Sequence, residues 1–344
     1  YALATHNQAS SIDSYNTAVG FNAGLSVTTG IENTLIGSLA GDALTDADFN
    51  VAIGVESLGS DTLGSKTVAI GVGALNAQNF TTATDTFNVA VGFHAGNDIT
   101  TGVQNTLIGG LAGDALTTAV NNIAIGYKAL TADTLGRKNV AIGVSALEDQ
   151  NFTTSTDSYN VAIGDNAGAN VTTGLYNTLI GGLTGDALTD ADDNVAIGVN
   201  ALSSDTLGSK STAIGRTALQ AQNFTTATNT YNVAVGFEAG ANVTTGVENT
   251  LIGALVGDAI TTGEENAIVG FLSGTSLTDA DFNCVLGTQA LATDTKGNRS
   301  IAIGQGALNV QNFTTSTDTY NIAVGNHAGL SITTGVDNTI LGSL

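Results

Sequence analysis

The sequence contains no proline, methionine or tryptophan, one cysteine and only eight basic residues. The lone Cys284 excludes an intrachain disulfide framework, so backbone hydrogen bonds and packing must hold the fold together. The net charge is −22, and we expect no nucleic-acid binding because the few basic residues cannot neutralise a phosphate backbone. No stretch of about 18 uninterrupted apolar residues occurs, so membrane insertion is not expected either.

The chain is poor in charge but not in apolar residues. Charged residues make up 11% of it, against about 25% in an ordinary soluble domain, whereas 42% is hydrophobic and 44 residues are glycine. A disordered chain would be poor in apolar residues, so we expect an ordered structure. The arrangement of the apolar residues therefore has to indicate the fold.

A motif of the type Asn-Val-Ala-Ile-Gly recurs through the whole sequence. Its glycine, called the motif glycine below, occurs 19 times. The first eight motif glycines are Gly20, Gly37, Gly54, Gly71, Gly92, Gly109, Gly126 and Gly143. Their spacings of 17, 17, 17 and 21 residues form a 72-residue block, and one additional 17-residue unit, which contains Gly270, follows Gly236. Insertion of a whole unit without loss of phase is typical of a linear stack of repeats.

Two polar residues keep fixed places relative to the motif glycine. Asparagine stands four residues before it in 16 of the 19 units, with Thr67, Ser211 and Ser300 as the exceptions, and threonine stands nine residues before it in every 17-residue unit. Stacked at the strand spacing of about 4.8 Å, such residues can hydrogen-bond along the stack, so we predict two structural ladders. Members of these ladders include Asn16, Asn33, Asn50, Asn88, Asn105, Asn122, Asn139, Asn160, Asn177, Asn194, Thr28, Thr45, Thr62 and Thr100.

The residues between the asparagine and the motif glycine are apolar on both sides of a short strand. Val or Ile directly precedes the glycine in 17 units, and Ala or a larger aliphatic residue stands one place earlier. A strand exposed on one face would alternate apolar with polar residues, so we expect burial on both sides. One side must face the lumen of the stack, and we expect the small Ala side to face another chain or sheet. The glycine itself fits a bend with positive φ.

These patterns predict an all-β protein, a parallel β-solenoid (β-roll) of about 19 coils of 17 or 21 residues in 72-residue blocks. We expect residues 1–344 to form a single continuous solenoid, uncapped at both ends, and to be a segment of a longer fibre. One coil alone would be unstable, because ordering 17 residues costs about 25 kcal/mol while few side chains are buried. Neighbouring coils must therefore stabilise one another.

The unit Asn-x-Ala-[Ile/Val]-Gly-x-x-[Ala/Ser], as in NVAIGVESL from Asn50 and NVAIGVSAL from Asn139, resembles the head repeats of trimeric autotransporter adhesins. Similar repeats occur in bacteriophage tail fibres, and the resemblance covers essentially the whole chain. It implies a left-handed parallel β-roll, a homotrimer around a threefold axis, and an extracellular place on a virion fibre or cell surface. Attachment to a cell-surface receptor such as a glycan is the function it implies. The coils are longer than the adhesin head repeat, so the fibre architecture carries over more safely than the autotransporter identity.

The 21-residue coils carry nearly identical inserts of the type Asn-Phe-Thr-Thr-Ala-Thr. Each insert places an aromatic residue on a predicted protrusion, and these residues are candidate receptor contacts. They are Phe80, Phe152, Phe224 and Phe313. The alternative is that each ring packs back over the edge of its coil. Asn-Phe-Thr is also an acceptor pattern for glycosylation in a secretory route.

Other candidate sites have simpler interpretations. Carboxylates cluster at Asp46 and Asp48, at Asp190, Asp192 and Asp193, and at Asp279 and Asp281, and such spacing could hold Ca²⁺, although a solvated acidic face explains them as well. The other blocks replace His94 and His327 by Asn or Glu, so that column does not require an imidazole. Cys284 is most simply a small hydrophobic residue. We therefore expect no cofactor, and only a weakly supported Ca²⁺ site.

Four functions are compatible with such a solenoid. A non-enzymatic structural fibre or adhesin segment that mediates attachment explains the repeat best. A self-assembling filament whose subunits stack end to end is the main alternative, since an uncapped β-edge invites pairing. An ice-binding solenoid is a minor alternative because only one threonine column is continuous. An enzyme is not expected, because we find no catalytic constellation that interrupts the repeat at one place.

Overall fold

The structure, a computed structural model, describes residues 1–8 and 13–344 of the chain. The described residues form short β-strands and turns and contain no helix, and none of them lies in a helix long and apolar enough to cross a membrane. The chain divides into two compact units, Tyr1–Thr173 and Gly174–Leu344, which are described separately. The expectation of one continuous solenoid over residues 1–344 stays a prediction.

Each unit contains a column of three-residue body strands, one per coil. Those of the first unit are β1 (Thr17–Val19), β2 (Thr34–Ile36), β3 (Val51–Ile53), β5 (Val68–Ile70), β7 (Val89–Val91), β8 (Thr106–Ile108), β9 (Ile123–Ile125), β11 (Val140–Ile142) and β13 (Val161–Ile163). Those of the second are β14 (Thr178–Ile180), β15 (Val195–Ile197), β17 (Thr212–Ile214), β19 (Val233–Val235), β20 (Thr250–Ile252), β21 (Ala267–Val269), β22 (Cys284–Leu286), β24 (Ile301–Ile303), β26 (Ile322–Val324) and β27 (Thr339–Leu341).

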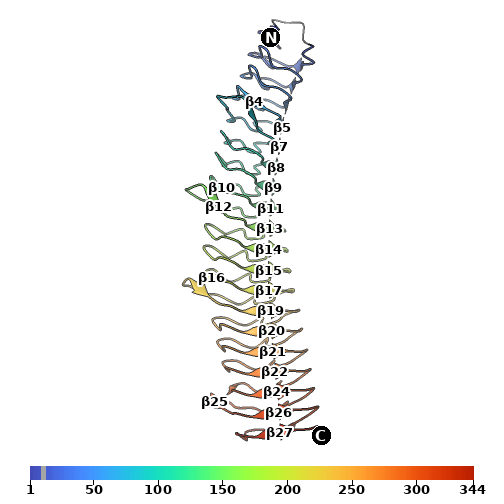
Figure 1. Ribbon diagram of the computed structural model, residues 1–344, viewed down its shortest axis with the longest axis vertical. Coiled ribbons are helices and arrows are strands. Elements are labelled where there is room, and N and C mark those ends of the chain that lie inside the picture. The colour runs from blue at the N-terminus through green and yellow to red at the C-terminus, as the bar shows by residue number, and fades with distance from the viewer. Residues whose placement is uncertain (9–12) are drawn as a thin grey trace. The chain divides into compact units, whose positions relative to one another are not determined.

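Equivalent residues of successive coils pair in parallel register. Val68 of β5 pairs with Val89 of β7, 21 residues later, and Thr106 of β8 pairs with Ile123 of β9, 17 residues later. Within each unit, Figure 1 shows these strands one above another. The predicted parallel β-solenoid of about 19 turns is confirmed.

Each 21-residue coil adds a short side ladder. In the first unit β4 (Gly64–Ser65) pairs with β6 (Thr84–Asp85), and β10 (Gly136–Arg137) pairs with β12 (Thr156–Asp157). In the second unit β16 (Gly208–Ser209) pairs with β18 (Thr228–Asn229), and β23 (Gly297–Asn298) pairs with β25 (Thr317–Asp318). The labelled side ladders lie to the left of the body strands in Figure 1. The additional residues of the long coils thus form protrusions on that side.

The middle residue of each body strand faces the lumen. Leu35, Ala52 and Leu107 are fully buried in this position, whereas the residues before and after them on the strand are partly exposed. The expectation that the small Ala side faces another chain was wrong, and the larger Val and Ile side faces outward instead. The reason is the width of the lumen, which is narrow enough to be filled by Ala or Leu from one strand and a second side chain from the turn.

Two kinds of coil fill the lumen in different ways. In one kind a glycine four residues after the motif glycine leaves room for leucines: a Cβ on Gly41 would lie 2.8 Å from side-chain atoms of both Leu35 and Leu44. In the other kind the strand contributes Ala52, and Leu58 occupies the place of that glycine with nearly the same φ, 53° against 54°. In these coils a large residue therefore faces a small one, which keeps the interior close-packed. Where both residues are small, as with Ala90 and Gly96, leucines of the neighbouring coils, Leu75 and Leu107, fill the space.

Candidate interaction face

The outward face of the body strands is uncharged and mostly apolar. The residue directly before the motif glycine is Val, Ile or Leu in all 19 coils, and the residue two places earlier is Val, Ile, Thr, Ala or Cys. Most of these side chains are half-buried within the single chain, and several are exposed, such as Val19, Ile108 and Leu286. Neither column contains a charged residue, so each unit carries an uncharged strip of sheet along its body strands.

Aromatic residues border this strip on both sides. One border lies five residues before the motif glycine and the other directly after it, and 13 of the 18 Tyr and Phe residues of the chain stand in these two columns. All 13 are exposed: Tyr15, Phe49, Phe87, Tyr159, Tyr176, Tyr231, Phe282 and Tyr320 on the first border, and Phe21, Phe93, Tyr127, Phe237 and Phe271 on the second. Exposed apolar patches beyond a few hundred Å² usually mark a binding surface.

The basic residues are concentrated on the same borders. Six of the eight Lys and Arg side chains lie over aromatic rings there, for example Lys138 at 4.8 Å from the Tyr159 ring centroid and Arg299 at 4.3 Å from that of Phe282. The remaining four pairs are Lys66 with Phe87, Lys128 with Tyr127, Lys210 with Tyr231 and Arg216 with Phe237. A cation held over a ring stays exposed and covers part of the aromatic surface.

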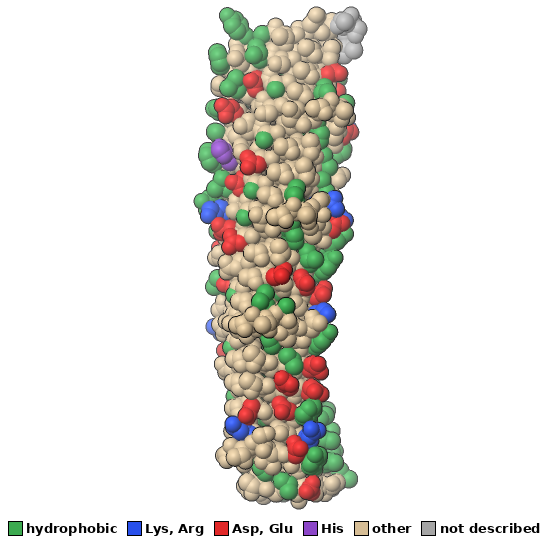
Figure 2. Space-filling model, turned by 90° about the vertical axis from the view of Figure 1, so that its left-hand side faces the viewer, with side chains coloured by type: hydrophobic (Ala, Val, Ile, Leu, Met, Phe, Trp, Pro, Cys, Tyr) green, Lys and Arg blue, Asp and Glu red, His purple; other side chains and the backbone are tan. Residues whose placement is uncertain are grey.

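We call the two strand columns, their borders and the residue after the second border the apolar face. It contains six basic and eight acidic residues, whereas the remainder of the chain contains two basic and 22 acidic residues. The net charge of the apolar face is therefore −2 (6 − 8), against −20 (2 − 22) for the remainder, because the basic residues are concentrated on this face while the acidic residues are spread over the whole chain. Figure 2 views the molecule from the side of the protrusions, which is mainly polar with scattered acidic side chains.

Ion pairs hold several border cations in place. The Lys138 ammonium donates to Asp157 at 2.6 Å and to the Tyr159 hydroxyl at 2.8 Å, and these hydrogen bonds raise the pKa of Lys138. The same Lys138 contact is the main cause that lowers the pKa of Asp157. Lys66 pairs with Asp85 in the same way at 2.5 Å. These groups are exposed, so the pairs orient the border more than they stabilise the fold.

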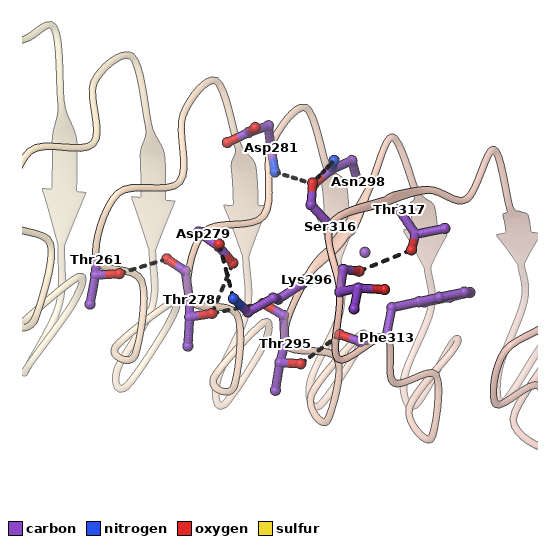
Figure 3. Close-up of polar contacts among 12 residues, drawn as sticks. Thr261, Thr278, Asp279, Asp281, Thr295, Lys296, Asn298, Phe313, Ser316 and Thr317 are labelled. Carbon is purple, nitrogen blue, oxygen red and sulfur yellow. Dashed lines mark hydrogen bonds and ion pairs between the residues drawn. The ribbon is translucent and has the colours of Figure 1, made fainter.

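The two predicted ladders lie on other sides of the coil. Asn33 accepts at its Oδ1 from the backbone N–H of Asn50 at 3.0 Å, and its Nδ2 donates to the carbonyl of Ala47 at 2.8 Å, so each amide connects its coil to the next. The Thr45 hydroxyl donates to the Thr62 carbonyl at 3.1 Å. Figure 3 shows the same pattern where Thr261 donates to Thr278. The side chains of both ladders therefore make their hydrogen bonds to neighbouring coils of the same chain.

The four insert phenylalanines do not project into solvent. Phe80, Phe152, Phe224 and Phe313 are each only 6–7% exposed, and the Phe80 backbone N–H donates to a buried carboxylate of Asp61 at 3.1 Å. A ring with so little accessible surface can make almost no contact with a receptor. The burial favours the packing interpretation over the receptor-contact interpretation.

The acidic clusters are used within the stack. Asp48, Asp192 and Asp281 each accept a backbone N–H from the preceding coil, at 2.8, 2.7 and 2.9 Å. Asp279 pairs with Lys296 at 3.2 Å in Figure 3. Within residues 1–8 and 13–344, no group of three or more His, Cys, Asp or Glu residues is arranged to hold a metal ion. A Ca²⁺ site therefore gains no support from the geometry.

The remaining singled-out residues have local roles. The His94 ring stacks on Phe93 with centroids 4.1 Å apart and covers Gly73, whose missing side chain makes room for it. His327 covers Gly306 in the same way. Cys284 is a free, exposed thiol on β22, within the apolar face.

Sequence reasoning missed a buried polar network between each long coil and the 17-residue coil before it. Asp61 accepts from Gln78 Nε2 at 2.6 Å, and Asn88 Nδ2 donates to Gln78 Oε1 at 2.8 Å. The network recurs with Asp133, Gln150 and Asn160, with Asp205, Gln222 and Asn232, and with Asp294, Gln311 and Asn321. The available signal was the residue seven places after the motif glycine. It is regularly Asp or Gln in these coils, where other coils have Val, Leu or Ile.

The same network explains the interruptions of the asparagine ladder. The Thr67 hydroxyl bonds to that of Thr86 at 2.7 Å, and Ser211 and Ser300 bond to Thr230 and Thr319 in the same way. A 21-residue coil brings a second hydroxyl to this place, so a shorter side chain replaces asparagine there.

No protein-family model matches this chain, and no curated protein matches it. The repeat and the geometry of the apolar face are therefore the basis for a functional proposal.

Proposed function

We propose that this chain is a non-enzymatic structural segment of an extracellular fibre, whose copies associate through the apolar face as a homotrimer. The observation that carries the proposal is the uncharged strip of strand side chains, whose borders hold 13 exposed aromatic residues and most of the basic residues of an otherwise acidic protein. An apolar centre rimmed by Tyr, Phe and Arg is typical of protein interfaces.

The periodicity of the face favours a second copy of this chain as the partner. Its aliphatic side chains recur once per coil, at a spacing of about 4.8 Å. Only a surface with the same repeat can interdigitate with it over many coils, and another solenoid of this sequence has that repeat. The resemblance to adhesin head and tail-fibre repeats, in which three chains surround an axis, supports three copies over two.

The remaining outer surface fits attachment. It is acidic and rich in hydroxyl groups, and the long coils add protrusions to it at regular intervals. We propose that the fibre belongs to a virion or a cell surface and binds a cell-surface receptor, a glycan being the class that the resemblance suggests. The titratable networks recur from block to block, which supports a structural role over a catalytic one.

Sedimentation and light scattering of the purified chain test the proposed assembly. We expect the mass of three chains at micromolar concentration. Ile108→Lys, which places a charge on the apolar face, should weaken association at least tenfold, whereas Thr118→Lys, an exposed position outside that face, should leave it unchanged. A monomer of full length at this concentration would overturn the proposal.

Cys284 offers an independent readout. Its thiol is exposed in the single chain and lies on the apolar face, so association should slow its reaction with a maleimide at least tenfold. The Ile108→Lys variant should restore fast labelling. Equal labelling rates in the associated and dissociated states would show that the copies use another surface.

A further inference from the structure

The four Asn-Phe-Thr sequences of the long coils occupy the same exposed place in their blocks. Each asparagine and each following threonine is exposed, and the phenylalanine between them is buried. These sequences span residues 79–81, 151–153, 223–225 and 312–314. The buried ring anchors the segment, so the amide and the hydroxyl on either side of it are presented to solvent.

The asparagine side chain is not needed by the threonine ladder. The Thr62 hydroxyl has one hydrogen and lies 2.8 Å from the Phe80 carbonyl but 3.1 Å from Asn79 Oδ1. The same preference holds in the other three copies, with the carbonyl at 2.6–2.9 Å and the amide oxygen at 3.1–3.3 Å. The ladder is therefore completed by the backbone, and the exposed Nδ2 of Asn79 donates to no atom of the residues that the structure describes.

The hydroxyl of the threonine two places later is also available to an enzyme. The side chains of four threonines are exposed and make no hydrogen bond to residues 1–8 or 13–344: Thr81, Thr153, Thr225 and Thr314. In contrast, the Thr84 hydroxyl donates to the carbonyl of Thr82 at 2.9 Å. An exposed Asn-x-Thr in a non-helical segment is the arrangement that an asparagine glycosyltransferase recognises.

We propose that Asn79, Asn151, Asn223 and Asn312 are acceptor sites for N-linked glycosylation. In the reaction the Asn Nδ2 forms a bond to C1 of a sugar whose C1–O bond to a diphosphate leaving group breaks, and the amide nitrogen loses one proton. The donor is a nucleotide-diphosphate or lipid-diphosphate sugar. The sites lie eight residues after the motif glycine, outside the apolar face, so the attached sugars leave that face free for association.

Three other Asn-x-Ser/Thr sequences occur in the chain, beginning at Asn170, Asn242 and Asn298. The last two are matched internal controls. Asn298, followed by Arg299 and Ser300, is only 7% exposed, and its Nδ2 donates to Ser316 Oγ at 3.1 Å, as Figure 3 shows. The Asn242 Nδ2 donates to the Asp258 carbonyl at 2.7 Å. Both have the required sequence, but their amide nitrogens are engaged within the fold.

The test uses the folded full chain, a soluble asparagine glycosyltransferase and a nucleotide-diphosphate hexose, with peptide mapping by mass spectrometry. We expect one hexose on each of the four insert asparagines and at least tenfold less on Asn298 and Asn242. Asn79→Gln and Thr81→Val should each remove one hexose, whereas Thr81→Ser and the neighbouring Asn76→Gln should keep all four. Circular dichroism of each variant checks that the fold is retained.

Two results would overturn the proposal. One is the absence of hexose from all four sites while a free peptide containing Asn-Phe-Thr is modified under the same conditions. The other is equal modification of Asn298, which would show that sequence without structural accessibility decides the outcome. The assembly state of the modified chain is a separate measurement and does not bear on the acceptor sites.

Discussion

Two neighbouring stretches of the first unit fill the same lumen with opposite chemistry. The coil around Gly109 is aliphatic, with Leu107 and Leu116 fully buried. In the next two coils the lumen holds a buried carboxylate, Asp133, and then a buried amide, Gln150. The backbone of the two stretches is nonetheless the same, with identical three-residue strands in parallel register.

The difference shows that the fold depends on the backbone pattern more than on a continuous hydrophobic core. The aliphatic coils gain stability from apolar burial and close packing, whereas the long coils depend on complete hydrogen bonding of buried polar groups. The aliphatic coils should therefore respond to changes in volume, and the long coils to changes in hydrogen-bond donors and acceptors.

The largest expected effect concerns what both regions share, the motif glycine. Gly109 has a φ of 138°, and a Cβ there would lie 2.4 Å from the carbonyl oxygen of Gly126. Gly109→Ala should lower the free energy of unfolding by about 4 kcal/mol, since it combines backbone strain with a backbone clash. Denaturant titration measures it. Gly110→Ala is the matched control, because its Cβ would meet only the Tyr127 ring at 3.6 Å and should cost little.

A change of volume in the aliphatic coil should have the next largest effect. Leu107→Ala should destabilise the protein by about 3 kcal/mol because it leaves a cavity. Gly113→Leu alone should also destabilise it, since its Cβ would lie 2.9 Å from Leu107 and 2.8 Å from Leu116. The double variant removes the Leu107 contact and copies the pairing of Ala124 with Leu130, while Leu116 stays where that coil has Asp133. It should recover at least about 1 kcal/mol relative to the sum of the single effects. Strictly additive effects in denaturant titration would contradict compensation between these positions.

Much of this architecture could be predicted from the sequence because the repeat is nearly regular. The asparagine and threonine columns, the bend at Gly109 and the parallel stacking all follow from one spacing. The side of the strand that faces inward was predicted wrongly, because an apolar strand has no alternation to orient it. A usable signal was present in the pairing of Leu107 with Gly113 and of Ala124 with Leu130, since compensating volumes indicate contact across a lumen.

The buried network could not be predicted in the same way. Asp61 and Gln78 are of residue types that usually lie at the surface. They are buried here only because two successive coils supply hydrogen-bond partners for their polar atoms. The apolar face was only partly visible, because the border columns alternate aromatic, basic and acidic residues. Their common exposure emerges once the coils are stacked.

The long coil should be sensitive to the direction of its hydrogen bonds. Asp61→Asn would place two donors, its own Nδ2 and Gln78 Nε2, opposite each other, at a cost of about 2 kcal/mol. Adding Gln78→Glu reverses donor and acceptor and should recover most of the loss, because the introduced carboxylate could also accept from Asn88. Asp85→Asn, at an exposed ion pair, should change stability by less than about 0.5 kcal/mol. If the double variant is no more stable in denaturant titration than Asp61→Asn, the proposed hydrogen-bond direction is wrong.

One copy of the network is incomplete and should be open to improvement. Asn139 stands where the other copies have Thr or Ser, and its buried Nδ2 makes no hydrogen bond. Its Oδ1 accepts from Ser158 at 2.8 Å. The double variant Asn139→Ser/Ser158→Thr copies the Ser211 and Thr230 pair and should stabilise the protein by about 1 kcal/mol. Thermal and denaturant unfolding measure the gain, and an unchanged midpoint would mean that the amide is satisfied by solvent.

The smallest expected effect is the contribution of the buried polar networks to the pH dependence of stability. Burial is the main cause that raises the pKa values of Asp61 and Asp133, against the hydrogen bonds that they accept. A carboxyl whose pKa is higher in the folded state stabilises the fold fully below its unfolded pKa of about 3.9, and this contribution is lost as the pH rises through the folded pKa. The free energy of unfolding should therefore fall as the pH rises from about 4. The variant Asp61→Asn/Asp133→Asn should show a smaller fall over the same range, because all other carboxyl groups titrate equally in both proteins. Equal slopes would assign the pH dependence to those other groups, among them the half-buried Asp42, Asp186 and Asp258.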